Sequence, residues 1–167
     1  GYDVSGSDII YSSTVKNLED KGITVKIGHH KKNILGKDIL VISSAIDKKN
    51  VELKEGLKLN IPVIQRAQML AELMRFNYGV AIAGTHGKTT TASMIASILI
   101  EAKLDPTIII GGIVNKFDNN YISGNGDLIV VEADEFDKSF LSLQPTFSVV
   151  NNMELEHLDI YKDINDL

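Results

Sequence analysis

Apolar, β-branched blocks alternate with stretches of helical character along the chain. Several blocks are continuous rather than alternating, as in strands covered on both faces. The pattern predicts strands over 3–5, 23–27, 39–43, 62–64, 79–83, 107–110, 128–132 and 148–151, and helices over 13–21, 50–59, 67–75 and 88–101. The last of these helices is expected to pack through one apolar stripe, made of Met94, Ile95, Ile98 and Leu99. Because strands and helices alternate, we expect an α/β protein with parallel sheets.

A change of character near residues 75–78 predicts a domain boundary. Before it, strands are short and lysines are frequent; after it, a strand runs directly into a loop that contains glycine. We therefore expect one unit over 1–77 and another over 78–167. The chain starts with glycine rather than methionine, already in a strand-like run, so we expect it to be part of a longer protein.

The composition of the 167 residues excludes several classes of protein. With 44% hydrophobic residues the chain can bury a core, and 17 basic against 22 acidic side chains give no reason to expect a nucleic acid or an anionic membrane as partner. No apolar run approaches the ~18 residues of a membrane span. The absence of cysteine excludes disulfides, thiolate zinc sites and cysteine nucleophiles, and it fits a reducing compartment.

The segment 83–91, with the sequence AGTHGKTTT, has the makeup of a phosphate-binding loop. It follows an apolar strand and opens a helix, and its glycines let several backbone N–H groups point at one anion near the helix N-terminus. Lys88 is then placed to reach the β- and γ-phosphates of a nucleotide, and the hydroxyl of Thr89 or Thr90 to bind Mg²⁺. The loop is shorter than the common G-x-x-x-x-G-K-[ST] pattern, because Ile82 stands where that pattern has glycine. A chance tripeptide that caps a helix is the alternative.

Carboxylates appear where the strand 128–132 ends. Ligands of open parallel sheets sit at the carboxyl ends of strands, so Glu132 is placed to hold a metal beside the phosphates. Asp134, Glu135 and Asp137 follow it and are interpreted as surface or supporting groups. A solvated acidic loop is the alternative for all of them.

Polar residues also follow the strand 148–151. Asn152 and Glu154 either shape the nucleotide site or cap the next turn. His157 could bind a second metal or orient a phosphate, although a single histidine in a loop is more often not a ligand.

In the first unit, Asp8, Ser43 and Ser44 come directly after expected strands. An acidic residue at such a position often binds a ribose hydroxyl in dinucleotide-binding folds, but Asp8 can equally be a surface group. The two serines could line the same crevice or cap a helix. His29 and His30 stand beside two lysines and are interpreted as part of a solvated turn.

Taken together, these motifs resemble the Mur ligases, whose ATP loop has the pattern G-T-x-G-K-T-T. The loop 84–90 fits this pattern, and further matches follow in chain order over 6–8, 43–46, 66–75, 132–135, 139–141, 143–145, 152–154 and 157–159. His86 at the x position and the stretch 138–145 resemble the branch of the family that adds L-alanine. Two residues depart from the pattern: Asn151 stands where threonine is common, and Glu156 where aspartate is usual.

The resemblance implies a Rossmann-like domain that holds a UDP-sugar, a central P-loop-type domain that binds ATP, and a last domain that closes over it. Residues 1–77 would be the first domain, incomplete at its start, and 78–167 the beginning of the second. The implied ATP-binding residues are Gly84, Thr85, His86, Gly87, Lys88, Thr89, Thr90 and Asn152. The implied metal ligands are Thr89, Glu132 and His157, and the implied catalytic residues are Lys88, Glu132 and His157. Asp8, Ser43 and Ser44 are the candidates for UDP-sugar binding.

The implied reaction joins L-alanine to UDP-N-acetylmuramate with ATP and Mg²⁺, through an acyl phosphate, in cytoplasmic synthesis of peptidoglycan precursors. We expect the chain alone to be inactive, and its open half-sheets to favour self-association. One alternative is the recycling ligase of the same family, which adds a tripeptide. Others are a nucleotide-hydrolysing P-loop switch, which would not need His157, and a module that only folds and binds nucleotide weakly.

Overall fold

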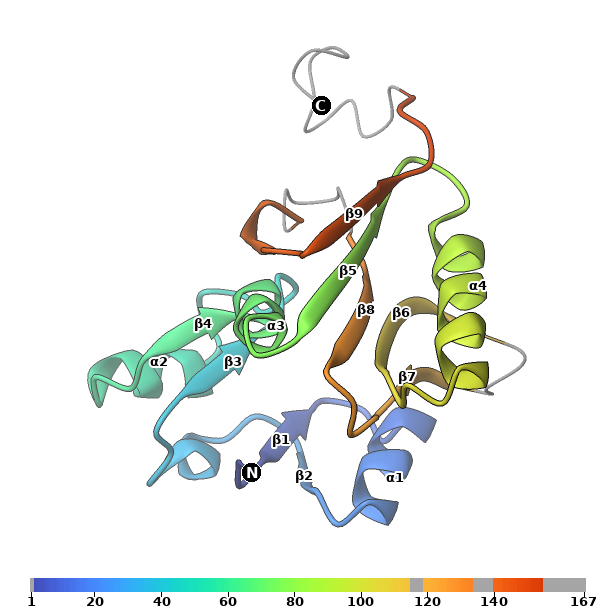
Figure 1. Cartoon of the computed structure of the whole chain (residues 1–167). Helices are drawn as coiled ribbons and strands as arrows, with labels where there is room; N and C mark the ends of the chain where they lie inside the picture. Colours follow the sequence, from blue (N-terminus) through green and yellow to red (C-terminus); the bar gives the residue numbers. More distant parts are fainter. Residues whose placement is uncertain (1, 115–118, 134–139, 155–167) are drawn as a thin grey trace. The chain divides into compact units, whose positions relative to one another are not determined.

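Figure 1 shows the computed structural model of the chain, which describes residues 2–114, 119–133 and 140–154. Contacts divide it into two compact units, Gly1–Arg66 and Ala67–Leu167. No helix among the described residues has the length and apolar character needed to cross a membrane.

The first unit contains two small parallel sheets. One pairs β1 (Ser5–Asp8) with β2 (Thr24–Ile27), and the other pairs β3 (Leu40–Ile42) with β4 (Val63–Gln65). Three helical segments connect these strands: α1 (Ser13–Asp20), the short 3₁₀ helix η1 (Lys31–Ile34) and α2 (Val51–Lys58). Side chains start both α-helices, since Ser12 Oγ accepts from the amide of Val15, and Asn50 Oδ1 accepts from the first-turn amides of α2.

The second unit is built on a five-stranded sheet of order β7-β6-β8-β5-β9. Its elements are α3 (Arg66–Met74), β5 (Tyr78–Ala83), α4 (Lys88–Glu101), β6 (Thr107–Val114), β7 (Asn119–Ile122), β8 (Leu128–Glu132) and β9 (Phe147–Val150). All strand pairs are parallel except β6 with β7. β5 lies between β8 and β9, so the carboxyl ends of these three strands meet at one edge, as the ribbon of Figure 1 shows.

The inner strands of the second unit's sheet bury apolar side chains on both faces. One face packs against α4 through Ile82, Ala92, Ala96, Ile108, Ile110 and Val130. The other buries Met74, Ala81, Ile129, Val131 and Ala133. This two-sided burial explains the continuous apolar runs of β5 and β8.

Only two of the four residues expected to form the apolar packing face of α4 do so. Ile95 and Leu99 pack against the sheet, but Met94 and Ile98 are 60% and 67% exposed. The fully buried positions are Ala92 and Ala96. Small side chains bring the helix close to the sheet, so the packing face is set by size as well as by hydrophobicity.

The α/β class with parallel sheets is confirmed, and most element bounds agree with the pattern within about two residues. The strand expected over 3–5 is wrong: β1 runs from Ser5 to Asp8, because pairing with β2 outweighs the turn preference of Gly6 and Ser7. η1 and β7 were not predicted, since neither has an apolar block of its own.

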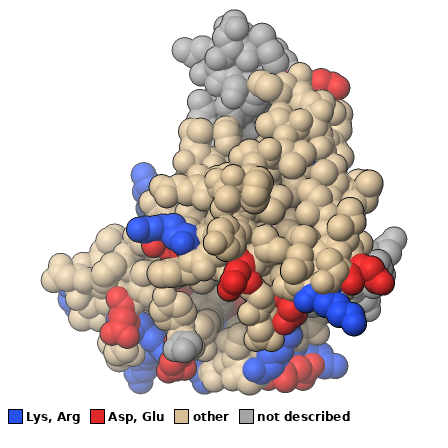
Figure 2. Space-filling model, in the orientation of Figure 1, with Lys and Arg blue, Asp and Glu red and all other residues tan. Residues whose placement is uncertain are grey.

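Charged side chains of both signs lie intermixed on the face drawn in Figure 2. This mixture agrees with the small net charge of −5.

Candidate functional site

The loop between β5 and α4 needs glycine at two places. Gly84 has φ +124° and Gly87 has φ +77°, both in the region that favours glycine. Gly87 is also the N-cap residue of α4, and within the described ranges no side chain caps that helix. The first turn of α4 therefore begins with backbone groups directed at the end of the sheet, the arrangement in which helix N-termini bind anions.

Lys88 lies across this loop. Its Nζ donates a hydrogen bond to the carbonyl oxygen of Gly84 at 2.7 Å, which keeps the ammonium group beside the glycine turn. Thr89, next along the first turn, is half-buried, and Thr90 is exposed. The positive side chain and the helix N-terminus thus lie on the same side of the loop.

The segment 151–154, which follows β9, fixes the shape of the loop. The amide of His86 donates to Asn152 Oδ1 at 2.9 Å, and the amide of Thr85 donates to the Asn152 carbonyl at 3.2 Å. The amide of Glu154 donates to Thr85 Oγ1 at 2.9 Å. A Cβ on Gly84 would come within 3.0 Å of the Asn152 backbone, so this close approach itself requires glycine.

Asn151 connects the loop to α4. Its Nδ2 donates to the carbonyl of His86 at 3.1 Å, and its Oδ1 accepts from Thr91 Oγ1 at 3.2 Å. An amide side chain does this with two separate atoms, one a donor and one an acceptor. The sequence marked Asn151 only as a departure from the family pattern, because its partners are known only once β9 is placed beside β5.

Glu132 ends β8 at the same edge of the sheet, in register with Ile82 of β5. Its Oε2 accepts a hydrogen bond from the amide of Gly111 at 2.9 Å. Its Oε1 is buried and has no hydrogen-bond partner among the described residues. A buried carboxylate oxygen without a partner is costly, and a bound cation would satisfy it. Glu132 therefore fits a metal ligand.

Four further candidates that follow β8 and β9 in the sequence lie outside the described residues. These are Asp134, Glu135, Asp137 and His157. Within the part of the chain that the structure describes, no group of three or more acidic, histidine or cysteine residues could hold a metal.

In the first unit, the three candidates lie at or just after the ends of strands, and the side chain of Asp8 makes a local hydrogen bond. Asp8 is exposed at the end of β1, and its Oδ1 accepts from the amide of Ile10 at 3.1 Å. Ser43 and Ser44 follow β3 in a turn, and neither starts a helix, since Asn50 caps α2. Asp8 thus ends one sheet of this unit and the serines end the other.

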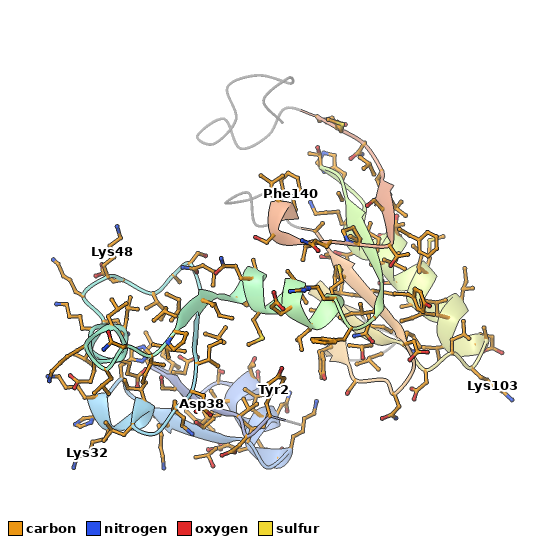
Figure 3. All side chains as sticks on the ribbon, turned by 60° about the vertical axis from the view of Figure 1, so that its left-hand side comes forward. Tyr2, Lys32, Asp38, Lys48, Lys103 and Phe140 are labelled. Carbon is orange, nitrogen blue, oxygen red and sulfur yellow. The ribbon has the colours of Figure 1, made fainter. Side chains whose placement is uncertain are left out.

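The expectation of a solvated turn is confirmed for His30, which is exposed, and is wrong for His29. The side chain of His29 is only 21% exposed, and its Nδ1 lies 3.1 Å from Oε2 of Glu52. The amide of His30 donates to the other oxygen of Glu52 at 3.0 Å. His30 is exposed, and so are the neighbouring lysines, of which Lys32 extends outward in Figure 3.

Glu52 was missed by the sequence reasoning altogether. It is the one buried charged residue in the described part of the chain, at 6% exposure. An acidic residue in the first turn of a helix is normally predicted to lie on the surface, and no local sequence pattern predicts that Glu52 is buried.

The sheet and the loop between β5 and α4 together indicate the class of protein. A largely parallel sheet in which an inner strand leads through a glycine turn into a helix N-terminus is a phosphate-binding α/β architecture. Models of the Mur ligase family match nearly the whole chain: "Mur ligase family, catalytic domain" over residues 1–78, and "Mur ligase middle domain" over residues 82–167. The chain belongs to the Mur ligase family.

Relatives of known name align with the whole chain. It is 51% identical over 167 residues to the UDP-N-acetylmuramate–L-alanine ligase of Acidobacterium capsulatum and 52% identical to that of Persephonella marina. These alignments cover 100% of this chain and 36% of each relative, so the chain spans about a third of their length.

Solved structures agree with the fold. A UDP-N-acetylmuramate–alanine ligase from Thermotoga maritima superposes with a TM-score of 0.84 at 29% identity, covering 94% of this chain and 37% of that one. A UDP-N-acetylmuramate:L-alanyl-γ-D-glutamyl-meso-diaminopimelate ligase from Neisseria meningitides gives 0.83 at 31% identity, covering 96% and 56%.

Proposed function

We propose that this chain is part of an ATP-dependent ligase that joins L-alanine to UDP-N-acetylmuramate during synthesis of peptidoglycan precursors. The observation that carries the proposal is the identity of 51–54% to ligases of that name along essentially the whole chain. The glycine loop, Lys88 and the oxygen of Glu132 that has no hydrogen-bond partner among the described residues agree with it, because they would supply positive charge and a metal ligand at one sheet edge.

The chemistry needs two displacement steps. A carboxylate resists attack by an amine, since its negative charge makes the carbon a poor electrophile. A carboxylate oxygen of the sugar first attacks the γ-phosphorus of ATP, and ADP leaves, which gives an acyl phosphate. The amine of L-alanine then attacks the acyl carbon, phosphate leaves with the electron pair of the C–O bond, and the new amide loses a proton to solvent.

The loop residues would hold and neutralise the phosphates. In this proposal the turn Gly84–Thr85–His86–Gly87 and the first turn of α4, with Thr90, surround the β- and γ-phosphates. Lys88 stabilises charge on the γ-phosphoryl group during transfer. Asn152 acts on ATP through the loop, because it holds the amide of His86.

Thr89, Glu132 and His157 are the proposed ligands of Mg²⁺. A magnesium ion bound there would neutralise phosphate charge and orient the γ-phosphoryl group. Glu132 contributes a half-buried carboxylate that is already held on one side by the amide of Gly111. Lys88, Glu132 and His157 are thus the residues that we propose for catalysis.

The remaining assignments follow from this function. Residues 1–77 would bind the UDP-sugar, with Asp8, Ser43 and Ser44 as contacts, and 78–167 would bind ATP. The reaction would take place in the cytoplasm and serve cell-wall growth, cell shape and division. The edge strand β9 exposes Phe147 and Val150 at 60% and 57%, which favours self-association of the chain when it is expressed alone.

A tripeptide ligase of the same family is the second candidate. The Neisseria structure supports it, because its TM-score of 0.83 nearly equals the 0.84 of the alanine ligase. The fold therefore does not separate the two candidates, and sequence identity favours the alanine enzyme.

A direct assay decides between them. The full-length ligase that carries this sequence is given ATP, Mg²⁺ and UDP-N-acetylmuramate, with either L-alanine or the tripeptide. We expect phosphate release with L-alanine. Release with the tripeptide alone would favour the recycling enzyme, and nucleotide hydrolysis independent of both would indicate a P-loop module without ligase activity.

A further inference from the structure

The buried carboxylate of Glu52 collects four hydrogen bonds from three different elements of the first unit. Its Oε2 accepts from Ser7 Oγ of β1 at 2.6 Å and lies 3.1 Å from Nδ1 of His29. Its Oε1 accepts from the amide of His30 at 3.0 Å and from Asn33 Nδ2 of η1 at 2.6 Å. Each oxygen thus has two partners, and the carboxylate is fully satisfied inside the protein.

These contacts favour the charged form of Glu52. Burial alone would raise its pKa, but the hydrogen bonds from Ser7, Asn33, the His30 amide and His29 outweigh burial, and the pKa is lowered from 4.5. At neutral pH the carboxylate is therefore ionised, and it can only accept hydrogen bonds.

The hydrogen bonds around Glu52 then determine which ring nitrogen of His29 carries the proton. Ser7 has one hydroxyl proton, which it donates to Glu52. Nδ1 of His29 lies 3.2 Å from Ser7 Oγ and 3.1 Å from Glu52 Oε2. Both of these oxygens can only accept from it, so Nδ1 must carry the proton. In the neutral imidazole the other nitrogen, Nε2, is then an acceptor.

The cluster lies at the edge of the sheet where a ligand is expected. Ser7 comes one residue before the end of β1, and His29 comes two residues after the end of β2. Because β1 and β2 are parallel, these are the carboxyl ends of both strands. Within the described residues, nothing hydrogen-bonds to Nε2 of His29, and the ring is partly exposed.

We infer that Glu52 is a positioning residue for the sugar-nucleotide site: it holds His29 with Nδ1 protonated, so that Nε2 accepts a hydrogen bond from an O–H or N–H group of the uridine. This inference rests on the proposed function, which places a UDP-sugar in the first unit. The role of Glu52 is indirect, because it acts through the orientation and protonation of the imidazole.

The tautomer can be measured without any ligand. In the full-length protein labelled with ¹⁵N in histidine, the ring resonances of His29 are assigned from their loss in His29→Asn. We expect the neutral ring to be protonated at Nδ1, and Glu52→Gln, whose amide can donate, to shift the ring toward protonation at Nε2. A wild-type ring protonated at Nε2 would overturn the inference, whatever reaction the protein catalyses.

Steady-state kinetics test whether Glu52 contributes to binding of the UDP-sugar. Glu52→Gln should raise KM for UDP-N-acetylmuramate about five- to tenfold, the effect of losing roughly one hydrogen bond, while kcat and KM for ATP stay unchanged. Glu55→Gln, on the same helix, is the matched control, because Glu55 pairs only with the exposed Lys31 and Lys58 in the described structure. A rise with Glu55→Gln equal to that with Glu52→Gln would contradict the inference.

A second variant covers the case in which Glu52→Gln folds poorly. His29→Asn keeps an N–H donor near Glu52 but removes the acceptor that corresponds to Nε2. We expect the same rise in KM for the UDP-sugar. An unchanged KM in a ligase that is otherwise active would overturn the inference alone, whereas a full-length protein with no ligase activity would overturn the proposed function.

Inhibition by two nucleotides identifies the group of the uridine that donates the hydrogen bond to His29. UMP and 2′-deoxy-UMP are compared as inhibitors of wild type and of His29→Asn. If the 2′-hydroxyl is the donor, wild type prefers UMP and the variant does not. If the base is the donor, the variant binds both inhibitors more weakly by the same factor. Equal inhibition of wild type and variant by both nucleotides would contradict any contact.

Discussion

The backbone amide of His86 donates a hydrogen bond to Oδ1 of Asn152 at 2.9 Å, and so joins the glycine loop to the segment that follows β9. These residues are 66 positions apart in sequence. They meet because β5 and β9 are neighbours in the sheet and both strands end at the same edge. The shape of the loop therefore depends on a strand that comes long after it.

Replacement of Asn152 by alanine tests this dependence. The His86 amide would lose its acceptor, and the loop would sample other conformations before it binds nucleotide. We expect Asn152→Ala to raise KM for ATP about three- to tenfold, as for the loss of about one hydrogen bond, with little change in KM for L-alanine. Asn125→Ala is the control, since Asn125 contacts Asp105 in a turn far along the chain from the loop. An unchanged KM for ATP would mean that the loop holds its shape without Asn152.

Gly84 should not tolerate a side chain. Its φ of +124° is strained for any other residue, and a Cβ would come within 3.0 Å of the Asn152 backbone. We expect Gly84→Ala to lower the free energy of unfolding by about 1–3 kcal/mol and to weaken ATP binding. Gly6→Ala is the matched control, because a Cβ on Gly6 would have no atom of the described residues within 4 Å and the φ of Gly6 is not positive. Urea unfolding of both variants checks this, and equal stabilities would contradict it.

The sequence predicted the second unit well because its signals are local. The apolar runs of β5 and β8 and the glycine-lysine loop each lie within a few consecutive residues. Their periodicity and turn chemistry do not depend on distant partners. The position of Glu132 at a strand end followed from the same pattern.

The prediction was wrong where the decisive contact is distant. The hydrogen-bond partners of Glu52 are 19 to 45 residues away in sequence, and no residue next to Glu52 indicates that they will meet it. The face of α4 was misjudged because Ala92 and Ala96 rank low in hydrophobicity, yet their size lets the helix approach the sheet. Such outcomes depend on which elements become neighbours in space.

Lys88 is the side chain on which the proposed phosphoryl transfer depends most directly. Lys88→Met keeps the length and apolar stem of the side chain but removes its charge. We expect ligation to fall by at least about a hundredfold, as when a group that stabilises transition-state charge is lost, with the fold intact. Phosphate release and circular dichroism measure the two properties.

A lysine at the opposite end of α4 serves as its control. Lys103 is exposed beyond the C-terminal end of the helix, where Figure 3 labels it. Lys103→Met removes the same charge from the same region of sequence and should leave turnover unchanged. Retained turnover in Lys88→Met, or equal losses in the two variants, would exclude the proposed role.

Glu132 is expected to control the magnesium requirement. Glu132→Gln keeps an oxygen for the Gly111 amide but removes the charge of the half-buried carboxylate. The half-saturating Mg²⁺ concentration should rise by at least about tenfold, the loss seen when even a group that only supports a metal ligand is removed. Glu101→Gln, at the exposed end of α4, is the control. A Mg²⁺ titration that superposes on that of wild type would show that Glu132 does not bind the metal.

The stability of the first unit should depend on acid through Glu52. The pKa of Glu52 is lowered in the folded protein from the ordinary value of 4.5, because its hydrogen bonds outweigh the opposing effect of burial. A group with a depressed folded pKa contributes stability that is fully present above the unfolded pKa and is lost as pH falls through the folded one. Urea-unfolding midpoints measured from pH 6 downward should therefore fall below about pH 4.5, and Glu52→Gln, which has no proton to gain, should fall less steeply. Parallel pH profiles for wild type and variant would show that the buried carboxylate contributes no pH-dependent stability.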